Sequence, residues 1–414
     1  MLGMKASKFK FAIFVYLVAM VSVHAVIFWN MRDLVRKGYS DFAIYYSAGS
    51  IVRQGLGRQL YDDRLQFKIQ KEVSPGVAIR LGALPYNHPP FEAVILSPLT
   101  YLPYPMAFAL WDCVNLAMLV ALPFLLRPHL PQLQNYSWLL WVLASLSFFP
   151  VFLNLLQGQD AILLLFLYTL AFVSLKKNCD LLAGGWLAFA LFKPHLVLPF
   201  IFFLLMQGRK KVLYGFVPIA GLVASLSLAV VGRVEVAAYP HYVLRLESTL
   251  AHGALIPVEM PNLRGALNLL FDGAPYLVPL VLAISLGLLV FTASQCSRGG
   301  KKNLFDLKFS LAAIATVLIS YHAMVYDLSM LLLPVMLVAN EFFGEGRFAD
   351  WRSAFIVISV VLFAFEPLQL LLSMRYNCAA LLCWLLLLWL AGVAGQISFR
   401  TRLESSSGVH AQPG

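Results

Sequence analysis

Long runs of apolar residues constrain the fold of this chain more than any other sequence feature. A helix of about 20 apolar residues spans a bilayer, and eight runs approach or reach that length. These runs are Phe11–Trp29, Met106–Leu126, Trp138–Asn154, Ala161–Leu175, Val212–Val231, Tyr276–Cys296, Ser353–Leu371 and Cys378–Ile397. Only 12% of the 414 residues are charged, against about 25% in soluble domains. The sequence therefore predicts an all-α integral membrane protein.

Four shorter or interrupted apolar runs add to this set. They are Leu181–Phe192, Pro194–Met206, Leu311–Ser320 and Leu328–Asn340. Short segments can lie at membrane depth when protein surrounds them or when they line a cavity. We therefore expect a multi-spanning helical bundle of about 12 transmembrane segments, which together form one membrane domain over residues 1–403.

The lysines and arginines orient this bundle. If the N-terminus lies inside and the segments alternate, the inner loops carry most of the basic residues, as the positive-inside rule requires. The short outer turns then hold only Lys193 and Arg375. Two long segments, residues 30–90 and 232–275, lie outside as extracytoplasmic loops. We expect the polar residues 404–414 to form a disordered cytoplasmic tail.

The N-terminus allows a second interpretation. Three lysines precede the first apolar run, and Val23-His24-Ala25 resembles a signal-peptide cleavage site. The apolar run continues to Trp29, which favours an uncleaved membrane helix. Cleavage would leave the topology of the remaining chain unchanged.

Several classes of ligand are disfavoured. The net charge of +11 comes mainly from the inner loops, and no basic stripe with interleaved aromatic residues indicates nucleic-acid binding. The five cysteines show no paired spacing, so we expect no disulfide framework and no metal site. Neither a glycine-rich phosphate loop nor an outer Asp-x-Asp pair occurs, so we expect no nucleotide and no cofactor.

The first outer segment, residues 30–90, has its own short helices. Residues 42–53 are predicted to be helical up to Gln54-Gly55. Apolar residues then repeat every four positions over Tyr61–Val73, which predicts an amphipathic helix lying in the membrane interface. The prolines of "LPYNHPPF" favour an extended path at the end of the segment.

Polar residues beside the apolar runs gather at the outer ends of their segments. They are Asp41; Tyr86, Asn87 and His88; Gln157, Gln159 and Asp160; Lys193 and His195; Asn262 and Arg264; and His322 and Asp327. Ionisable residues in membrane segments are costly and commonly mark functional sites. The convergence of six separate stretches on one face predicts a site there.

Each of these residues also has a structural interpretation. Asp41 would cap a helix beginning at Phe42 or pair with Arg36 or Lys37. Lys193 would extend to the lipid headgroups as an anchor. Because a helix break at the following proline favours a lysine that lines a cavity, we prefer a functional role for Lys193.

The remaining candidates are evenly balanced between structural and functional roles. His195 and His322 suit either a packed core or direct catalysis. Gln157 and Gln159 flank a glycine, so turn formation also explains them. Asp327 follows His322 by five residues and is placed to pair with it.

The order and spacing of these stretches resemble glycosyltransferase family 87, over about residues 41 to 337. The resemblance rests on Asp41 and on "GRQLYD", "YNHPPFEAVILSPLTYLP", "QGQ", "LAFALFKPHLVLP" and "SYHAMVYDLSMLLLP". It implies a GT-C-type fold in a multi-pass protein of the bacterial inner membrane, with a periplasmic active site. It also implies a polyprenyl-phosphate sugar donor, with mannose as the favoured sugar, and a lipid-linked or glycan acceptor. Membrane lipids are a further expected partner.

The chemistry of glycosyl transfer assigns roles to these residues. A carboxylate can take the acceptor proton, and Asp41 is the candidate base. Cationic groups stabilise a leaving phosphate, and the candidates for donor-phosphate binding are Lys193, His195 and His322. The candidates for binding sugar or acceptor are Tyr45, Tyr86, His88, Gln157, Gln159, Asn262 and Asp327. The expected enzyme is an inverting hexosyltransferase that uses a polyprenyl-phosphate sugar.

Two other function classes remain open. Broken helices with polar residues also suit a transporter or flippase for lipids or sugars, although transporter sites usually lie at mid-membrane between repeated halves. A membrane O-acyltransferase that relies on His322 is the other alternative, and it leaves Asp41 and Lys193 without a role.

Overall fold

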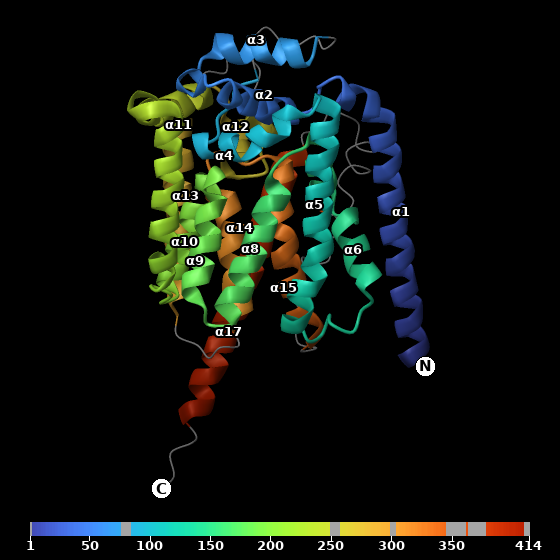
Figure 1. Ribbon diagram of the computed structural model, residues 1–414. Helices are drawn as coiled ribbons and strands as arrows, with labels where there is room; N and C mark the ends of the chain where they lie inside the picture. The colour runs from blue at the N-terminus through green and yellow to red at the C-terminus, as the bar shows by residue number, and fades with distance from the viewer. Residues whose placement is uncertain are drawn as a thin grey trace.

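The computed structural model describes residues 2–75, 84–248, 257–298, 304–344, 362 and 378–409, and all regular structure in these ranges is helical. Long helices run roughly side by side, and a set of shorter helices covers one end of the bundle (Figure 1). The N-terminus and the end of α17 lie at the opposite end of the bundle.

The helices have the following bounds. Those of the bundle are α1 (Leu2–Arg36), α5 (Tyr104–Leu126), α6 (Trp138–Ser147), α7 (Phe149–Gln157), α8 (Ala161–Lys176), α9 (Asp180–Phe189), α10 (Pro194–Met206), α11 (Val212–Ser248), α13 (Leu277–Ser297), α14 (Phe305–Ile319), α15 (Leu332–Gly344) and α17 (Cys378–Val409). The shorter elements are α2 (Phe42–Arg53), η1 (Gly57–Gln59), α3 (Asp63–Val73), α4 (Pro90–Leu96), η2 (Ser97–Tyr101), η3 (Arg127–His129), η4 (Ala190–Phe192), η6 (Pro257–Glu259), α12 (Leu263–Phe271) and η8 (Val325–Leu331).

Six stretches of helix in the described part of the chain are long and apolar enough to span a membrane. They are Phe11–Arg36, Tyr104–His129, Val212–Leu246, Leu277–Ser297, Val325–Phe343 and Ala379–Leu403. Helices α6 and α7 meet at a 68° bend and would form a seventh span if the bent pair counts as one. Six to seven of the expected 12 segments are therefore full-length spans in the described part of the chain, and α8, α9 with η4, and α10 are shorter apolar helices.

Burial explains why short apolar helices occur in this bundle. Phe309, Leu311 and Ile314 of α14 are all 0% exposed, and α14 packs against α10, α13, α15 and α17. A helix that is surrounded by protein need not match the thickness of the bilayer. The expected segment Ser353–Leu371 lies outside the described residues, except for Leu362.

Helices of the segment 30–90 cover one end of the bundle (Figure 1). Helix α2 ends at Arg53, as predicted, and α3 lies across the end of the bundle (Figure 1). Helix α3 begins at Asp63 rather than Tyr61, because the Asp62 side chain accepts hydrogen bonds from the backbone nitrogens of Arg64 and Leu65 at 2.8 and 3.1 Å.

Two glutamines fasten α3 to the extended segment that precedes α4. The Gln66 side chain accepts a hydrogen bond from the Tyr86 backbone nitrogen at 2.9 Å and donates to the Leu60 carbonyl at 2.7 Å. The Gln70 amide both donates to and accepts from the backbone of Leu84. The two buried glutamines of α3 therefore set the path of the chain towards His88.

One helix boundary agrees with the sequence pattern and one differs from it. Helix α11 is interrupted at Gly232, where φ is 84° and ψ is 171°, directly after the apolar run that was expected to end at Val231. Helix α17 continues to Val409. The start of the segment 404–414, which was expected to be a disordered tail, is therefore helical, and residues 410–414 lie outside the described ranges.

Candidate active site

The turn between α7 and α8, Gln157–Asp160, organises the site. Gly158 ends α7 in the left-handed conformation with φ of 63°. The indole nitrogen of Trp111 donates to the carbonyls of Gly158 and Gln159 at 3.1 and 3.2 Å. The turn is thereby fixed to α5. Two of its polar side chains, Gln157 and Gln159, contact Asp41, and the third, Asp160, contacts His88 and Lys193.

Replacing Gly158 by Ala should destabilise this turn. A Cβ atom there would lie 2.7 Å from Cβ of Phe42 and 2.8 Å from the ring of Phe108, and the left-handed conformation itself costs about 1–2 kcal/mol for other residues. Gly208 is a matched control, because its φ is 81° and nothing lies within 4 Å of the added atom. We expect Gly158→Ala to lower the unfolding temperature in detergent more than Gly208→Ala. Equal effects would mean that packing at the turn is not critical.

Asp41 lies at the start of α2 and contacts this turn through two glutamines. Its backbone nitrogen donates to Oε1 of Gln157 at 3.1 Å, and its Oδ2 accepts from Nε2 of Gln159 at 2.8 Å. The side chain makes no capping hydrogen bond to α2, so the capping interpretation is not supported. The residue is only partly buried. Its carboxylate is therefore held in position while part of the residue stays open to solvent.

Tyr45 connects the Asp41 region to His88. Its hydroxyl donates to Oε1 of Gln159 at 2.5 Å and lies 3.4 Å from Nε2 of His88. Tyr45 is 2% exposed, and Tyr86 is 1% exposed. Tyr86 donates to the Pro89 carbonyl and to Glu92. Both rings are buried in this structure, and sugar contact by Tyr45 and Tyr86 stays a prediction.

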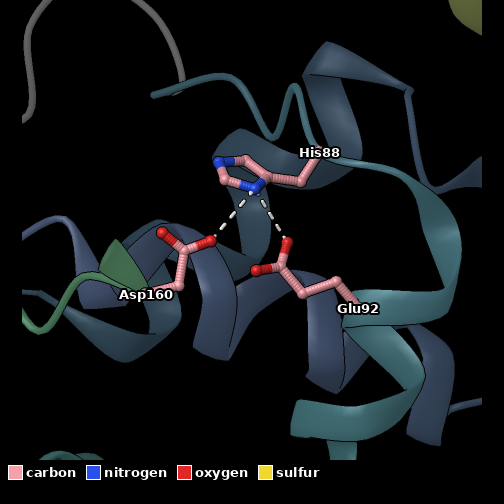
Figure 2. A group of neighbouring side chains, drawn as sticks. All are labelled: His88, Glu92 and Asp160. Atoms are coloured by element: carbon pink, nitrogen blue, oxygen red, sulfur yellow. Dashed lines mark ion pairs between the residues drawn. The ribbon is translucent and has the colours of Figure 1, made fainter. Parts of the chain in front are cut away.

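Buried charges of alternating sign continue the site from His88 to Asp327. The Nδ1 atom of His88 lies 2.9 Å from Oε2 of Glu92 and 3.6 Å from Oδ2 of Asp160 (Figure 2). The ammonium of Lys193 lies 2.8 Å from Oδ1 of Asp160 and 2.6 Å from Oδ1 of Asp327. With His88 protonated, each positive group lies between two carboxylates, which offsets the cost of burying them.

The surroundings of the Lys193 side chain differ from those that the sequence predicted. It lies at the break between η4 and α10, as predicted, but its side chain is only 4% exposed and is engaged by both carboxylates. A group in this position holds Asp160 and Asp327 together rather than presenting a charge to solvent. Asp327 in turn accepts a hydrogen bond from the backbone nitrogen of Met324 at 2.8 Å, so the pair also fixes the start of η8.

The two histidines expected to bind phosphate lie next to each other. The rings of His195 and His322 are 5.9 Å apart in an edge-to-face arrangement, and both residues are partly exposed. Nε2 of His195 is buried and has no hydrogen-bond partner in the described part of the chain. Nearby, the Arg264 guanidinium lies 4.0 Å above the ring of Tyr321 and donates to the Tyr321 carbonyl at 3.1 Å.

Asn262 has a structural position. Its Nδ2 donates to the Ser320 carbonyl at 2.9 Å and its Oδ1 accepts from the Gly265 nitrogen, so that it caps α12. The residue is 0% exposed. Both ends of the amide are engaged by the chain itself, which differs from the expectation that Asn262 binds sugar.

Sequence reasoning missed the roles of three residues at this site. Glu92 pairs with His88, Asp160 bridges His88 to Lys193, and the partly buried Tyr326 lies 5.3 Å from the Lys193 ammonium. The spacing of four residues between His88 and Glu92, at the start of a helix, was an available signal. The contact of Asp160 with Lys193 joins distant parts of the chain and left no local pattern.

Comparison with known proteins places the chain in a family. The model of glycosyltransferase family 87 matches residues 86–321, more than half of the chain. The chain belongs to glycosyltransferase family 87. No curated protein and no solved structure matches it. Family membership implies that the protein is a membrane glycosyltransferase.

The range matched by the family 87 model contains some of the candidate site residues but not all of them. The matched residues include His88, the turn 157–160 and Lys193. Asp41 and His322 lie outside the match. Their assignment to the site therefore rests on the contacts of this chain.

One cluster of the family 87 protein has the ligand types of a cation site. The ligand atoms of His88, Glu92 and Asp160 all lie within 4.8 Å of one another (Figure 2). Lys193 already supplies a positive charge to Asp160, and a protonated His88 supplies one to Glu92. That no metal binds here stays a prediction, which metal analysis of the purified protein would test.

The same cluster predicts a pH-dependent stability of the family 87 protein. Burial raises the pKa of Glu92 from 4.5 to about 7, although His88 beside it acts in the opposite direction. Burial also disfavours the charged form of His88, but the Glu92 and Asp160 carboxylates outweigh this and raise its pKa. Both raised pKa values stabilise the fold at low pH, and that stabilisation is lost as the pH rises through them.

We therefore expect the unfolding temperature in detergent to fall between pH 6 and pH 8.5, through a loss on the order of 1 kcal/mol from Glu92. Glu92→Gln keeps the shape of the side chain and removes its titration. The variant should show a smaller decrease over the same interval. An identical decrease in both proteins would show that Glu92 does not titrate in this range.

Proposed function

We propose that the protein is an inverting glycosyltransferase that moves a sugar from a polyprenyl-phosphate donor to a lipid-linked or glycan acceptor. The reaction takes place at the outer face of the bacterial inner membrane, and the resemblance to family 87 favours mannose as the sugar. The observation that carries the proposal is the position of Asp41. Its carboxylate is held by Gln159, belongs to a partly open residue, and lies in one connected network with Lys193.

Asp41 acts as the general base. The acceptor hydroxyl transfers its proton to the carboxylate while its oxygen forms a bond to the anomeric carbon of the sugar. The bond from that carbon to the phosphate oxygen breaks, and the electron pair leaves with the polyprenyl phosphate. Direct displacement inverts the anomeric carbon, so that a β-linked donor gives an α-glycoside. General base catalysis of this kind contributes about 10²–10⁴ in rate.

The leaving phosphate is stabilised by the histidine pair, His195 and His322. Both residues are partly exposed and their rings lie 5.9 Å apart, so that one phosphate group would reach both. Arg264 holds the backbone next to His322 and adds positive charge. Fixed donors stabilise developing negative charge strongly where water is excluded. Lys193 contributes indirectly by positioning Asp160 and Asp327.

Tyr326 is the proposed aromatic surface for the sugar. It is partly exposed, and its ring lies 5.3 Å from the ammonium of Lys193, which pairs with Asp160 and Asp327. The ring of Tyr45, by contrast, is buried in this structure. Gln157 and His88, which are partly exposed, remain candidates for hydroxyl contacts, since amides and imidazoles bond sugar hydroxyls. Gln159 and Asp327 are only 3% and 1% exposed, and they support the site through their contacts with Asp41 and Lys193.

A lipid or sugar transporter and a membrane O-acyltransferase are the alternative functions. The decisive experiment uses proteoliposomes, a polyprenyl-phosphate sugar labelled in the sugar, and a membrane-lipid acceptor fraction. Formation of a labelled glycolipid with inverted linkage supports the proposal. Movement of the label between leaflets without a new glycosidic bond would instead indicate a transporter. If the labelled sugar is neither transferred nor moved between leaflets, and the protein instead transfers a group from an acyl donor, it is an acyltransferase.

A further inference from the structure

An apolar groove lies between α12, α13 and α17, away from Asp41. Its volume is about 370 Å³. Leu263 and Leu267 of α12, Ile284 and Gly287 of α13, and Trp384 and Leu387 of α17 line it. Ile284 and Trp384 are 38% and 49% exposed. Helices α13 and α17 are both membrane-span candidates, so the groove opens where lipid chains lie.

Helix α12 connects this groove to the cationic side of the candidate site. One face of the helix gives Leu263 and Leu267 to the groove. At the same end, Asn262 and Arg264 hold the carbonyls of Ser320 and Tyr321, the two residues before His322. A wholly apolar groove therefore ends beside a buried guanidinium and an imidazole pair.

We propose that this groove holds the isoprenoid tail of the lipid-phosphate donor, an inference that rests on the proposed function. An amphiphile with an apolar tail and an anionic head matches an apolar groove with positive groups at one end. The acceptor hydroxyl is expected near Asp41, the proposed general base. Asp41 is held in position by α2 and by the turn between α7 and α8. The groove borders neither element, and this favours the donor rather than the acceptor as the occupant.

Gly287 is a position at which a substitution can block the groove. A Cβ atom built on it meets nothing within 4 Å outside its own helix, and Gly287 lines the groove, so the ring of Gly287→Phe would occupy the groove. Gly221 of α11 is the matched control, because it also lies in a membrane-span candidate and has nothing within 4 Å of its added atom. Gly221→Phe places the same ring on a surface away from the groove.

The experiment compares kcat/KM for two synthetic donors that carry the same sugar phosphate, one with a long isoprenoid tail and one with a tail of one or two isoprene units. With the long tail, Gly287→Phe should lower kcat/KM about tenfold or more, since losing burial of even two methylene groups has that effect. With the short tail, Gly287→Phe should match the wild type. Gly221→Phe should match the wild type with both donors.

A second variant protects the test against misfolding. Trp384→Ala removes one wall of the groove at an exposed position and should also lower kcat/KM selectively for the long donor. Equal losses with both donors, or no loss with the long donor, would overturn the proposal while leaving the glycosyltransferase function intact. A loss that follows the tail length of the acceptor would overturn it too and assign the groove to the acceptor. If the wild type uses neither donor, the proposed function itself fails.

Discussion

Asp41→Asn is expected to lower kcat for sugar transfer by about 10²–10⁴, because the amide cannot accept the proton of the acceptor hydroxyl. The KM for the donor should change little, since the lost interaction belongs to the transition state. Folding should persist, because the amide oxygen of the variant side chain would still accept the hydrogen bond that Gln159 donates at 2.8 Å to Asp41. The measurement is steady-state transfer by purified protein in proteoliposomes.

Asp62→Asn is the matched control for this substitution. Asp62 lies in the same outer segment and caps α3 through its side-chain oxygen, a function that asparagine performs equally well. Its transfer rate should equal that of the wild type. A folded Asp41→Asn protein with an unchanged kcat would remove Asp41 from the role of base and, with it, the proposed mechanism.

Lys193→Met is expected to be the most destabilising single substitution at the site. It leaves the buried carboxylates of Asp160 and Asp327 without the ammonium that lies 2.8 and 2.6 Å from them. Removing one partner of a buried ion pair typically costs about 3–5 kcal/mol. We expect a low yield of folded protein and a clear drop in unfolding temperature, measured in detergent at neutral pH.

Two comparisons separate positioning from chemistry at Lys193. Lys176→Met is the matched control, because Lys176 pairs with Asp306 at 2.6 Å but its side chain is 27% exposed, so its loss should cost less. The triple variant Lys193→Met, Asp160→Asn, Asp327→Asn removes these three buried charges together and should recover stability. Recovered stability with recovered transfer supports positioning. Recovered stability without transfer would indicate that the charges act in the reaction.

The sequence predicted the helical membrane class because apolar runs need no tertiary information to be recognised. The apolar run from Val212 to Val231 ended where α11 breaks at Gly232. The expected gathering of polar residues was also correct in space, since Asp41, the turn 157–160 and Lys193 are joined by direct contacts. The structure describes six to seven full-length spans and three shorter apolar helices. The sequence did not distinguish these two kinds of helix, because a short apolar run has the same pattern whether lipid or protein surrounds it.

The burial and the contacts of individual side chains could not be predicted from the sequence. Tyr45 and Lys193 were expected to face substrate, but both are buried and engaged by other side chains. Glu92 was not predicted as a site residue. Its partner His88 becomes part of a charged cluster only through Asp160, which lies on another part of the chain. These contacts depend on the packing of α4, α8 and η8, which are far apart in the chain.

The amino-acid sequence by itself determined that the protein is a helical membrane protein and that its polar residues meet at one end of the bundle, because hydrophobic length and the cost of burying charge act locally along the chain. Only the tertiary structure decided which polar groups neutralise one another and which stay open. Pairing in a low-dielectric interior depends on distances of a few ångströms between helices, and those distances are set by packing.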